Sequence, residues 1–129
     1  MAKGRGTVSC SARAIVALMV VSVLVLQSYY VQASTYIVGD SLKWAFNVVD
    51  WPKGKHFKAG DVLVFNYNPS FHNVVVVDSG GYNNCKTPAG ATTYTSGKDH
   101  LTLSKGQNFF ICNFPGHCEG NMKIAVTAV

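Results

Sequence analysis

The stretch from Cys112 to Met122 constrains this chain more than any other, and it reads Cys-Asn-Phe-Pro-Gly-His-Cys-Glu-Gly-Asn-Met. Within it a thiol, an imidazole and a thioether recur at equal spacing, because four residues separate Cys112 from His117 and four more separate His117 from Met122. Pro115-Gly116 and Gly120-Asn121 place a turn signal in each interval. Two tight turns bring the three side chains toward one point, so this stretch is predicted to be a metal-binding loop.

The donor atoms of this loop favour copper. A soft thiolate, an imidazole and a weak thioether, offered together, suit copper better than zinc, calcium or magnesium. A trigonal copper site needs one more histidine, and His72 stands at the head of a strand-like run upstream. Zinc is the alternative occupant, but a structural zinc site would need a hard donor or a thiolate where Met122 stands. His56 and His100 have polar or charged neighbours and are expected at the surface.

Residues 1–33 are predicted to form a secretory signal peptide. Lys3, Arg5 and Arg13 precede an apolar run at 14–26, and Val31-Gln32-Ala33 offers small or apolar residues for cleavage after Ala33. Residues 34–129 would then form one small domain. The apolar run of about 13 residues is shorter than the roughly 20 that a spanning helix needs, so no stable membrane anchor is expected.

Cleavage changes both the charge and the cysteine count. Residues 34–129 carry eight lysines against six carboxylates, a net charge of +2 that is too small and scattered to predict nucleic-acid binding. Cleavage also removes Cys10 and leaves Cys85, Cys112 and Cys118 in an oxidising compartment. One disulfide and one metal-binding thiolate would account for this odd number.

The position of Cys118 directly after His117 favours Cys112 as the ligand, because adjacent side chains of an extended loop point apart. Cys85 and Cys118 would then form the disulfide, worth about 4 kcal/mol in the chain-entropy model. A bridge between Cys112 and Cys118 that leaves Cys85 free is the alternative left open by the residues themselves.

Short strands separated by turns are predicted for the rest of residues 34–129. Four consecutive valines at 74–77 indicate a strand covered on both sides. The segments 47–54 and 82–97 are predicted to be loops, each with room for a helical turn. The other predicted strands are 35–38, 62–67, 101–103, 107–114 and 123–129. About seven strands of this kind predict an all-β, Greek-key β-sandwich.

Three pieces of this sequence resemble the phytocyanins, the plant blue copper proteins, and among them the plantacyanin or basic blue protein group: His72-Asn73, the run from Cys112 to Cys118, and Met122. The resemblance covers about 35–129. It implies a cupredoxin-like fold with one disulfide, between Cys85 and Cys118, and one copper ion held by His72, Cys112, His117 and an axial Met122. Methionine rather than glutamine at the axial position differs from stellacyanins. No hydrophobic tail follows Val129, so a GPI anchor is not expected.

These residues lead us to expect a secreted type 1 copper protein, a monomeric single-electron carrier of the apoplast or cell wall that cycles between Cu(I) and Cu(II). Asn73, beside the first ligand, is expected to hydrogen-bond across to the Cys112 strand. An aromatic and apolar patch of Phe71, Phe114 and Pro115 is expected to dock a redox partner. That partner would be an unidentified protein or a small-molecule reductant.

Other functional classes compete with this expectation. An enzyme is not expected, because the chain has four histidines and no His-x-His pair for a copper oxidase. A hydrolase using Cys112 and His117 lacks a recognisable orienting partner. The stronger rival is an extracellular signalling or cell-wall-binding protein in which copper is structural or incidental.

Overall fold

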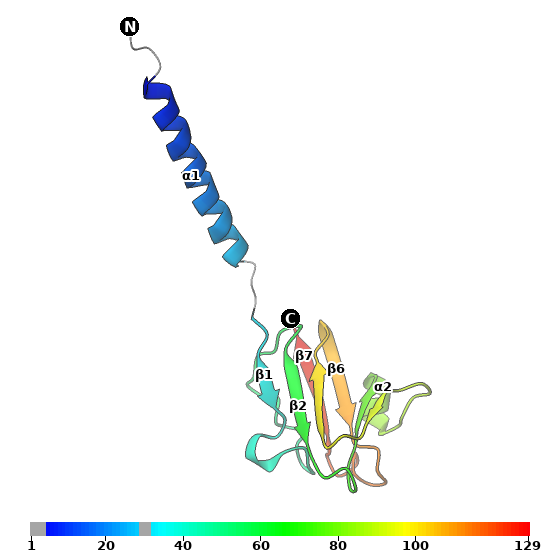
Figure 1. Cartoon of the computed structure of the whole chain (residues 1–129). Coiled ribbons are helices and arrows are strands. Elements are labelled where there is room, and N and C mark those ends of the chain that lie inside the picture. The colour runs from blue at the N-terminus through cyan, green and yellow to red at the C-terminus, as the bar shows by residue number, and fades with distance from the viewer. Residues whose placement is uncertain (1–4, 29–31) are drawn as a thin grey trace. The chain divides into compact units, whose positions relative to one another are not determined.

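The β-branched and aromatic runs of the sequence pair into two sheets (Figure 1). The computed structural model describes residues 5–28 and 32–129. Within 32–129, seven strands form one sheet of order β1-β2-β5 and another of order β4-β3-β6-β7. The strands are β1 (Thr35–Ile37), β2 (Val62–Asn66), β3 (Val74–Val77), β4 (Thr93–Tyr94), β5 (Lys98–Thr102), β6 (Gly106–Ile111) and β7 (Lys123–Ala128). Only the β1–β2 pair is parallel in this described part, and the predicted all-β sandwich is confirmed.

The hydrophobic core draws on strands of both sheets. Leu63 and Phe65 of β2 belong to the same buried cluster as Phe110 of β6 and Ile124 of β7. In β7, buried and less buried residues alternate along the strand, as expected for a strand with one face on the core. Trp44 lies in the same core against Phe65, with ring centroids 5.0 Å apart. The packed interior gives the loops at the strand ends a fixed base.

The pairing of β3, β6 and β7 brings the predicted ligands to one end of the sandwich. Val75 of β3 pairs with Ile111 of β6, and Ile111 also pairs with Lys123 of β7. Because both pairs are antiparallel, the end of β6 lies beside the starts of β3 and β7. Cys112 follows β6 directly, and Met122 directly precedes β7. The sheet register therefore fixes the backbone positions of Cys112 and Met122.

The segment after β3 differs from the prediction. Residues 82–97 were expected to be a loop with room for a helical turn, but the helix α2 (Ser79–Asn84) begins earlier and the short strand β4 lies within the segment. The Asp78 side chain caps this helix by accepting a hydrogen bond from the Gly81 backbone N–H at 2.7 Å. Cys85 ends the helix in a left-handed conformation, with φ 52°. A short 3-10 helix, η1 (Asp40–Leu42), follows β1.

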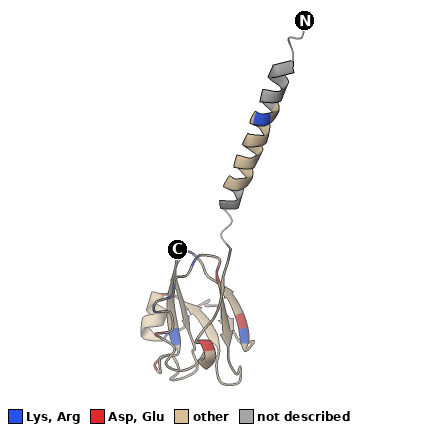
Figure 2. Ribbon diagram, turned by 90° about the vertical axis from the view of Figure 1, so that its left-hand side faces the viewer, with Lys and Arg blue, Asp and Glu red and all other residues tan. Residues whose placement is uncertain are grey.

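The N-terminal part forms a separate unit. The helix α1 (Arg5–Ser28) lies within the unit Met1–Gln32, and Ala33–Val129 forms the other unit. Among the described residues, no helix is both long enough and apolar enough to cross a membrane. Lys3 and Val31, and the side chains of Arg5 and Cys10, lie outside the described residues, and the signal peptide stays a prediction. On the β-sandwich, lysines and carboxylates are interspersed (Figure 2).

Candidate metal centre

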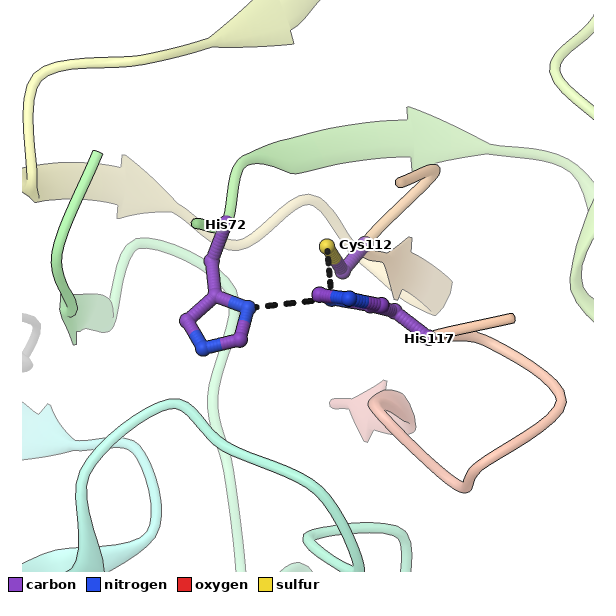
Figure 3. Close-up of side chains that lie close together, drawn as sticks. All are labelled: His72, Cys112 and His117. Atoms are coloured by element: carbon purple, nitrogen blue, oxygen red, sulfur yellow. Dashed lines mark hydrogen bonds between the residues drawn. The ribbon is translucent and has the colours of Figure 1, made fainter. Parts of the chain in front are cut away.

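Three of the predicted ligands converge at the end of the sandwich (Figure 3). One nitrogen of His72, one nitrogen of His117 and the sulfur of Cys112 all lie within 4.8 Å of one another. The two Nδ1 atoms are 3.0 Å apart, and the Cys112 Sγ lies 3.5 Å from the His117 Nδ1. The two imidazoles thus turn the same ring nitrogen toward each other, and that of His117 also faces the thiol. This is the arrangement that three ligands of one small ion require.

Backbone hydrogen bonds shape the loop that carries the second histidine. The Cys112 N–H donates to the Met122 carbonyl, and the Met122 N–H donates to the His117 carbonyl, each at 3.0 Å. The His117 N–H donates to the Phe114 carbonyl, also at 3.0 Å. Gly116 adopts a left-handed conformation at φ 81°, as its turn requires. The two turns predicted from the sequence are present, and they return the chain to Met122.

His72 is positioned by a turn of its own. The backbone N–H groups of Phe71 and His72 both donate to the Asn68 carbonyl, at 3.0 and 3.1 Å. The Asn68 side chain also accepts from the Ser70 backbone N–H at 2.9 Å. This turn precedes β3 and directs His72 toward the loop that follows β6 and carries His117. A polar Asn-Pro-Ser sequence thus has a local structural function here.

Burial sets the electrostatics of the centre. Cys112 is fully buried and, among residues 32–129, is the cysteine with a free thiol. Burial raises the pKa of this thiol, while backbone N–H groups of Asn73 and Phe114 act in the opposite direction. Burial, and then the nearby His117, lower the pKa of His72. The lowered pKa keeps the His72 imidazole neutral to lower pH, and a neutral imidazole is the form that binds a metal.

Met122, the fourth predicted ligand, lies at the end of the loop that carries Cys112 and His117. Its side chain is fully buried and belongs to the same core cluster as Cys112. Its backbone forms hydrogen bonds with the backbone of both Cys112 and His117. His56 and His100 are exposed, as predicted, and lie outside the cluster.

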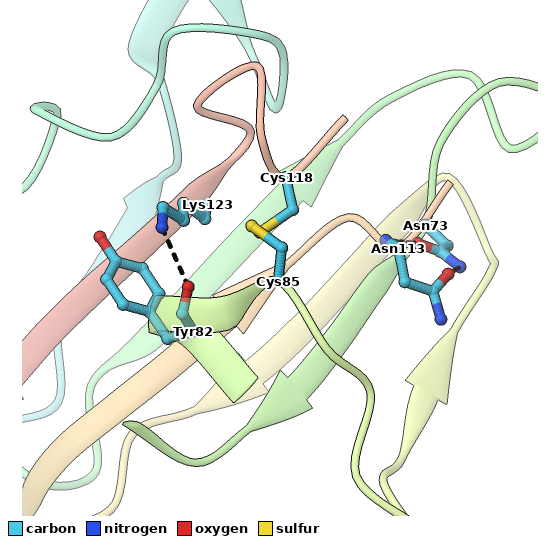
Figure 4. Close-up of a disulfide and its surroundings, with 6 residues drawn as sticks. All are labelled: Asn73, Tyr82, Cys85, Asn113, Cys118 and Lys123. Carbon is cyan, nitrogen blue, oxygen red and sulfur yellow. Dashed lines mark hydrogen bonds between the residues drawn. A yellow bond between two sulfur atoms is a disulfide. The ribbon is translucent and has the colours of Figure 1, made fainter. Parts of the chain in front are cut away.

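A side-chain network links the His72 strand to the Cys112 strand (Figure 4). The Asn73 Nδ2 donates to the Asn113 Oδ1 at 2.6 Å, and the Asn113 backbone N–H donates to the Asn73 Oδ1 at 3.0 Å. The Trp44 Nε1 donates to the Asn73 carbonyl at 2.9 Å, and Asn113 donates onward to the Thr87 hydroxyl at 3.0 Å. The contribution of Thr87 had no signal in the sequence, because it comes from the loop between α2 and β4.

The disulfide joins Cys85 to Cys118 (Figure 4). This confirms the predicted pairing and excludes the alternative bridge between Cys112 and Cys118. Cys118 is buried in a second core cluster with Val75 and Ile111. Because Cys118 follows His117 directly, the disulfide attaches the ligand loop to the end of α2. Lys123 secures the same helix by donating to the Tyr82 carbonyl at 2.9 Å, with its Nζ 4.3 Å from the Tyr82 ring centroid.

Aromatic rings surround the exposed edge of the centre. The Phe46 ring centroid lies 4.7 Å from that of His117 and 5.9 Å from that of His72. The Phe114 ring centroid lies 5.6 Å from that of His117. Phe71, which directly precedes His72, is 61% exposed. Sequence reasoning missed Phe46, because no spacing rule connects it with the distant ligand loop. The structure brings it there through hydrogen bonds from residues 47 and 48 to the carbonyls of residues 120 and 121.

The donor set tests which ion fits this centre. One free thiol, two imidazoles held at one point and a buried thioether match the ligands of a blue-copper site, and the cluster offers no carboxylate for a hard cation. The chain is thus, by fold and site, a β-sandwich of the mononuclear blue-copper class.

Comparison with known proteins gives the family. Residues 44–122 match the family model of the plastocyanin-like domain. The chain is 78% identical to the basic blue protein of Arabidopsis thaliana over 129 residues, which is 100% of both chains. It belongs to the phytocyanins, the plant blue copper proteins, and to their plantacyanin group.

Solved structures agree with this assignment. The cucumber basic protein, a blue copper protein, superposes with a TM-score of 0.74 at 64% identity, covering 74% of this chain and 100% of that chain. Spinach plantacyanin superposes with a TM-score of 0.64 at 56% identity, covering 67% of this chain and 94% of that chain. These matches confirm the predicted cupredoxin-like fold.

Proposed function

We propose that the protein is a secreted one-electron carrier that uses a single copper ion. The observation that carries this proposal is the convergence of His72, Cys112 and His117, whose donor atoms lie within 4.8 Å of one another beside a buried Met122. When bound, copper supplies a one-electron couple between Cu(I) and Cu(II).

The residues would hold the ion as follows. Cys112 would supply the thiolate, His72 and His117 would supply two imidazole nitrogens, and Met122 would supply the weak thioether donor that tunes the potential. The backbone bonds of the loop and the disulfide at Cys118 hold these donors from the protein side. Donors fixed in this way move little when the charge of the site changes, and a small rearrangement favours rapid electron exchange.

The electron would enter and leave at the edge of His117. This side chain is partly exposed, and its ring contacts Phe46 and Phe114. Pro115 and Phe71 are exposed and lie close in sequence to the two histidines. An apolar surface of this kind would dock a redox partner protein through a weak, short-lived contact, with a small-molecule reductant as the other candidate. Membrane lipid and nucleic acid are not partners in this proposal.

An electron carrier fits the site better than an enzyme. Among the described residues, one group of three potential metal ligands is present, and the buried Met122 lies beside it. Blue copper proteins are generally electron carriers rather than enzymes. We therefore place the protein outside the enzymes, as a monomer exported after cleavage behind Ala33 to the apoplast or cell wall.

The visible spectrum of the copper-loaded protein tests the proposal. The oxidised protein is expected to show the intense blue absorption of a Cu(II)–thiolate bond, and Cys112→Ser should abolish it, whereas Cys85→Ser combined with Cys118→Ser should retain it. Reversible bleaching by a reductant and recovery with an oxidant would support the electron-carrier function. A colourless protein, or one whose colour survives Cys112→Ser, would contradict it.

The rival function is extracellular signalling or cell-wall binding with an incidental copper ion. The Cys112→Ser variant separates the two functions, since it keeps the Cys85–Cys118 disulfide but lacks the thiolate. Full biological activity of this variant in the plant would favour the binding function.

A further inference from the structure

A buried carboxylate far from the metal centre has no cationic partner in the described residues. Asp61 is 1% exposed. Its Oδ1 accepts a hydrogen bond from the Ser34 backbone N–H at 2.9 Å, and its Oδ2 accepts one from the Lys58 backbone N–H at 2.8 Å. The ion pairs found in the described part of the chain involve other carboxylates. A buried carboxylate whose donors are all neutral gains further stabilisation when one of them becomes a cation.

One of the two donors is the residue that follows the predicted cleavage site. Signal-peptide cleavage would hydrolyse the Ala33–Ser34 peptide bond with one water molecule. Ala33 would leave with a new carboxylate, and the Ser34 nitrogen would become an α-amino group that is protonated at neutral pH. The atom that now donates to Asp61 as a neutral amide would then carry a positive charge.

Ser34 is held in place independently of this charge. Its carbonyl accepts a hydrogen bond from the Val62 N–H at 2.9 Å, and the next residue, Thr35, begins the parallel pairing of β1 with β2 opposite Val62. The new α-amino group would therefore stay within hydrogen-bond distance of the Asp61 carboxylate. A cation placed next to a buried carboxylate stabilises it by a charge-assisted hydrogen bond, which is roughly twice as strong as a neutral one.

We infer that Asp61 is the binding site for the α-ammonium group of Ser34, so that removal of the leader completes a buried ion pair and fixes β1 to the sandwich. This inference rests on the secretion step of the proposed function. The Lys58 contact has a separate explanation, because the Asp61 N–H also donates to the Lys58 carbonyl at 3.0 Å and the two bonds close a turn. The Ser34 contact has no such local explanation, since it joins positions that are far apart in the sequence.

The experiment uses the secreted, copper-loaded protein, whose N-terminus is first determined by mass spectrometry. We expect it to begin at Ser34. The free form is then compared with a form acetylated at the α-amino group alone, in the parent protein and in Asp61→Asn. In the parent, acetylation should lower the thermal midpoint by about 4–8 °C, the range in which a domain of this size responds to the loss of one good interaction.

The outcomes separate the ion pair from a merely structural contact. In Asp61→Asn, acetylation should have no effect, whereas in the matched control Asp50→Asn, which changes an exposed carboxylate, the full effect should remain. An unchanged midpoint on acetylation of the parent, an equal change in both backgrounds, or an N-terminus elsewhere would overturn the inference. If Asp61→Asn does not fold, an unchanged midpoint on acetylation of the parent still overturns the inference. The blue absorption of each form is measured as a control. It reports whether the copper site is intact, independently of whether the ion pair forms.

Discussion

Gly120 is required for the aromatic cover of His117, and Gly120→Ala tests this directly. A Cβ atom at this position would lie 2.7 and 2.9 Å from two carbons of the Phe46 ring, and 3.2 Å from the Gly116 carbonyl oxygen. Carbon atoms pack at about 3.5–4.0 Å, so the ring must move by roughly 1 Å. Phe46 is 47% exposed and can swing outward, so the cost comes from its separation from the two histidine rings rather than from core strain.

The size of this effect follows from the aromatic pairing that the Phe46 ring gives up. An aromatic pair contributes about 0.5–1.5 kcal/mol beyond its buried area, so Gly120→Ala should destabilise the protein by roughly 1 kcal/mol, which corresponds to a midpoint lower by about 4–8 °C. The assay is thermal unfolding of the copper-loaded protein in a double-mutant cycle with Phe46→Ala. In the Phe46→Ala background, Gly120→Ala should cost much less, because the ring that it displaces is absent.

Gly116→Ala provides the matched control for Gly120→Ala. A Cβ at Gly116 would meet no heavy atom within 4 Å, but its φ of +81° is unfavourable for alanine. Its cost should therefore be the same with and without the Phe46 ring. If Gly120→Ala also costs the same in both backgrounds, the steric explanation is wrong.

Three further predictions concern other parts of the protein. Phe71→Asp should slow electron exchange with an anionic or apolar partner protein while the blue absorption stays unchanged, because the side chain is exposed; an unchanged rate in stopped-flow measurements would exclude this residue from the docking surface. Asn73→Ala removes the side-chain bonds between the two ligand strands, so the free energy of unfolding should fall by about 1–3 kcal/mol in denaturant titration, and a smaller decrease would mean that water replaces the amide. Burial and the hydrogen bond to Asp99 raise the pKa of Tyr67 above its ordinary value of 10.0. The folded state therefore holds this proton more tightly, so its stabilising effect is complete below pH 10 and is lost as the pH rises further. Tyr67→Phe should therefore reduce the fall in the free energy of unfolding above pH 10. Tyr82→Phe removes another tyrosine whose pKa is raised and gives the size of the effect for a tyrosine that lacks the bond to Asp99.

The sequence was most informative where chemistry and turn signals coincide. The equal spacing of Cys112, His117 and Met122, together with the turns between them, predicted a loop that the structure contains. The odd cysteine count predicted one disulfide and one free thiol, and the pairing of Cys85 with Cys118 agrees. Such features depend on local geometry and on the number of reactive groups, and both can be read from a single chain.

Features that depend on long-range packing could not be predicted in this way. Phe46 reaches His117 because its loop bonds to the ligand loop, and Thr87 reaches Asn113 from a segment predicted to be irregular. The helix α2 begins before the segment 82–97 in which a helical turn was predicted, because the Asp78 side chain caps a helix at Ser79-Gly80-Gly81. Glycine-rich segments have weak intrinsic preferences, so a single capping bond decides their conformation.

The different attachment of the ligands to the sheet has a consequence for how this site could be altered. Cys112 and Met122 directly adjoin paired strands and His72 stands two residues before β3, whereas His117 stands within the connecting turns. A change in the length of the 113–121 connection would therefore move one ligand and leave the anchoring of the other three to the sheets. Changes in the length or sequence of residues 113–121 would therefore alter the position of His117 and the surface around it together, while the β-sandwich stays the same.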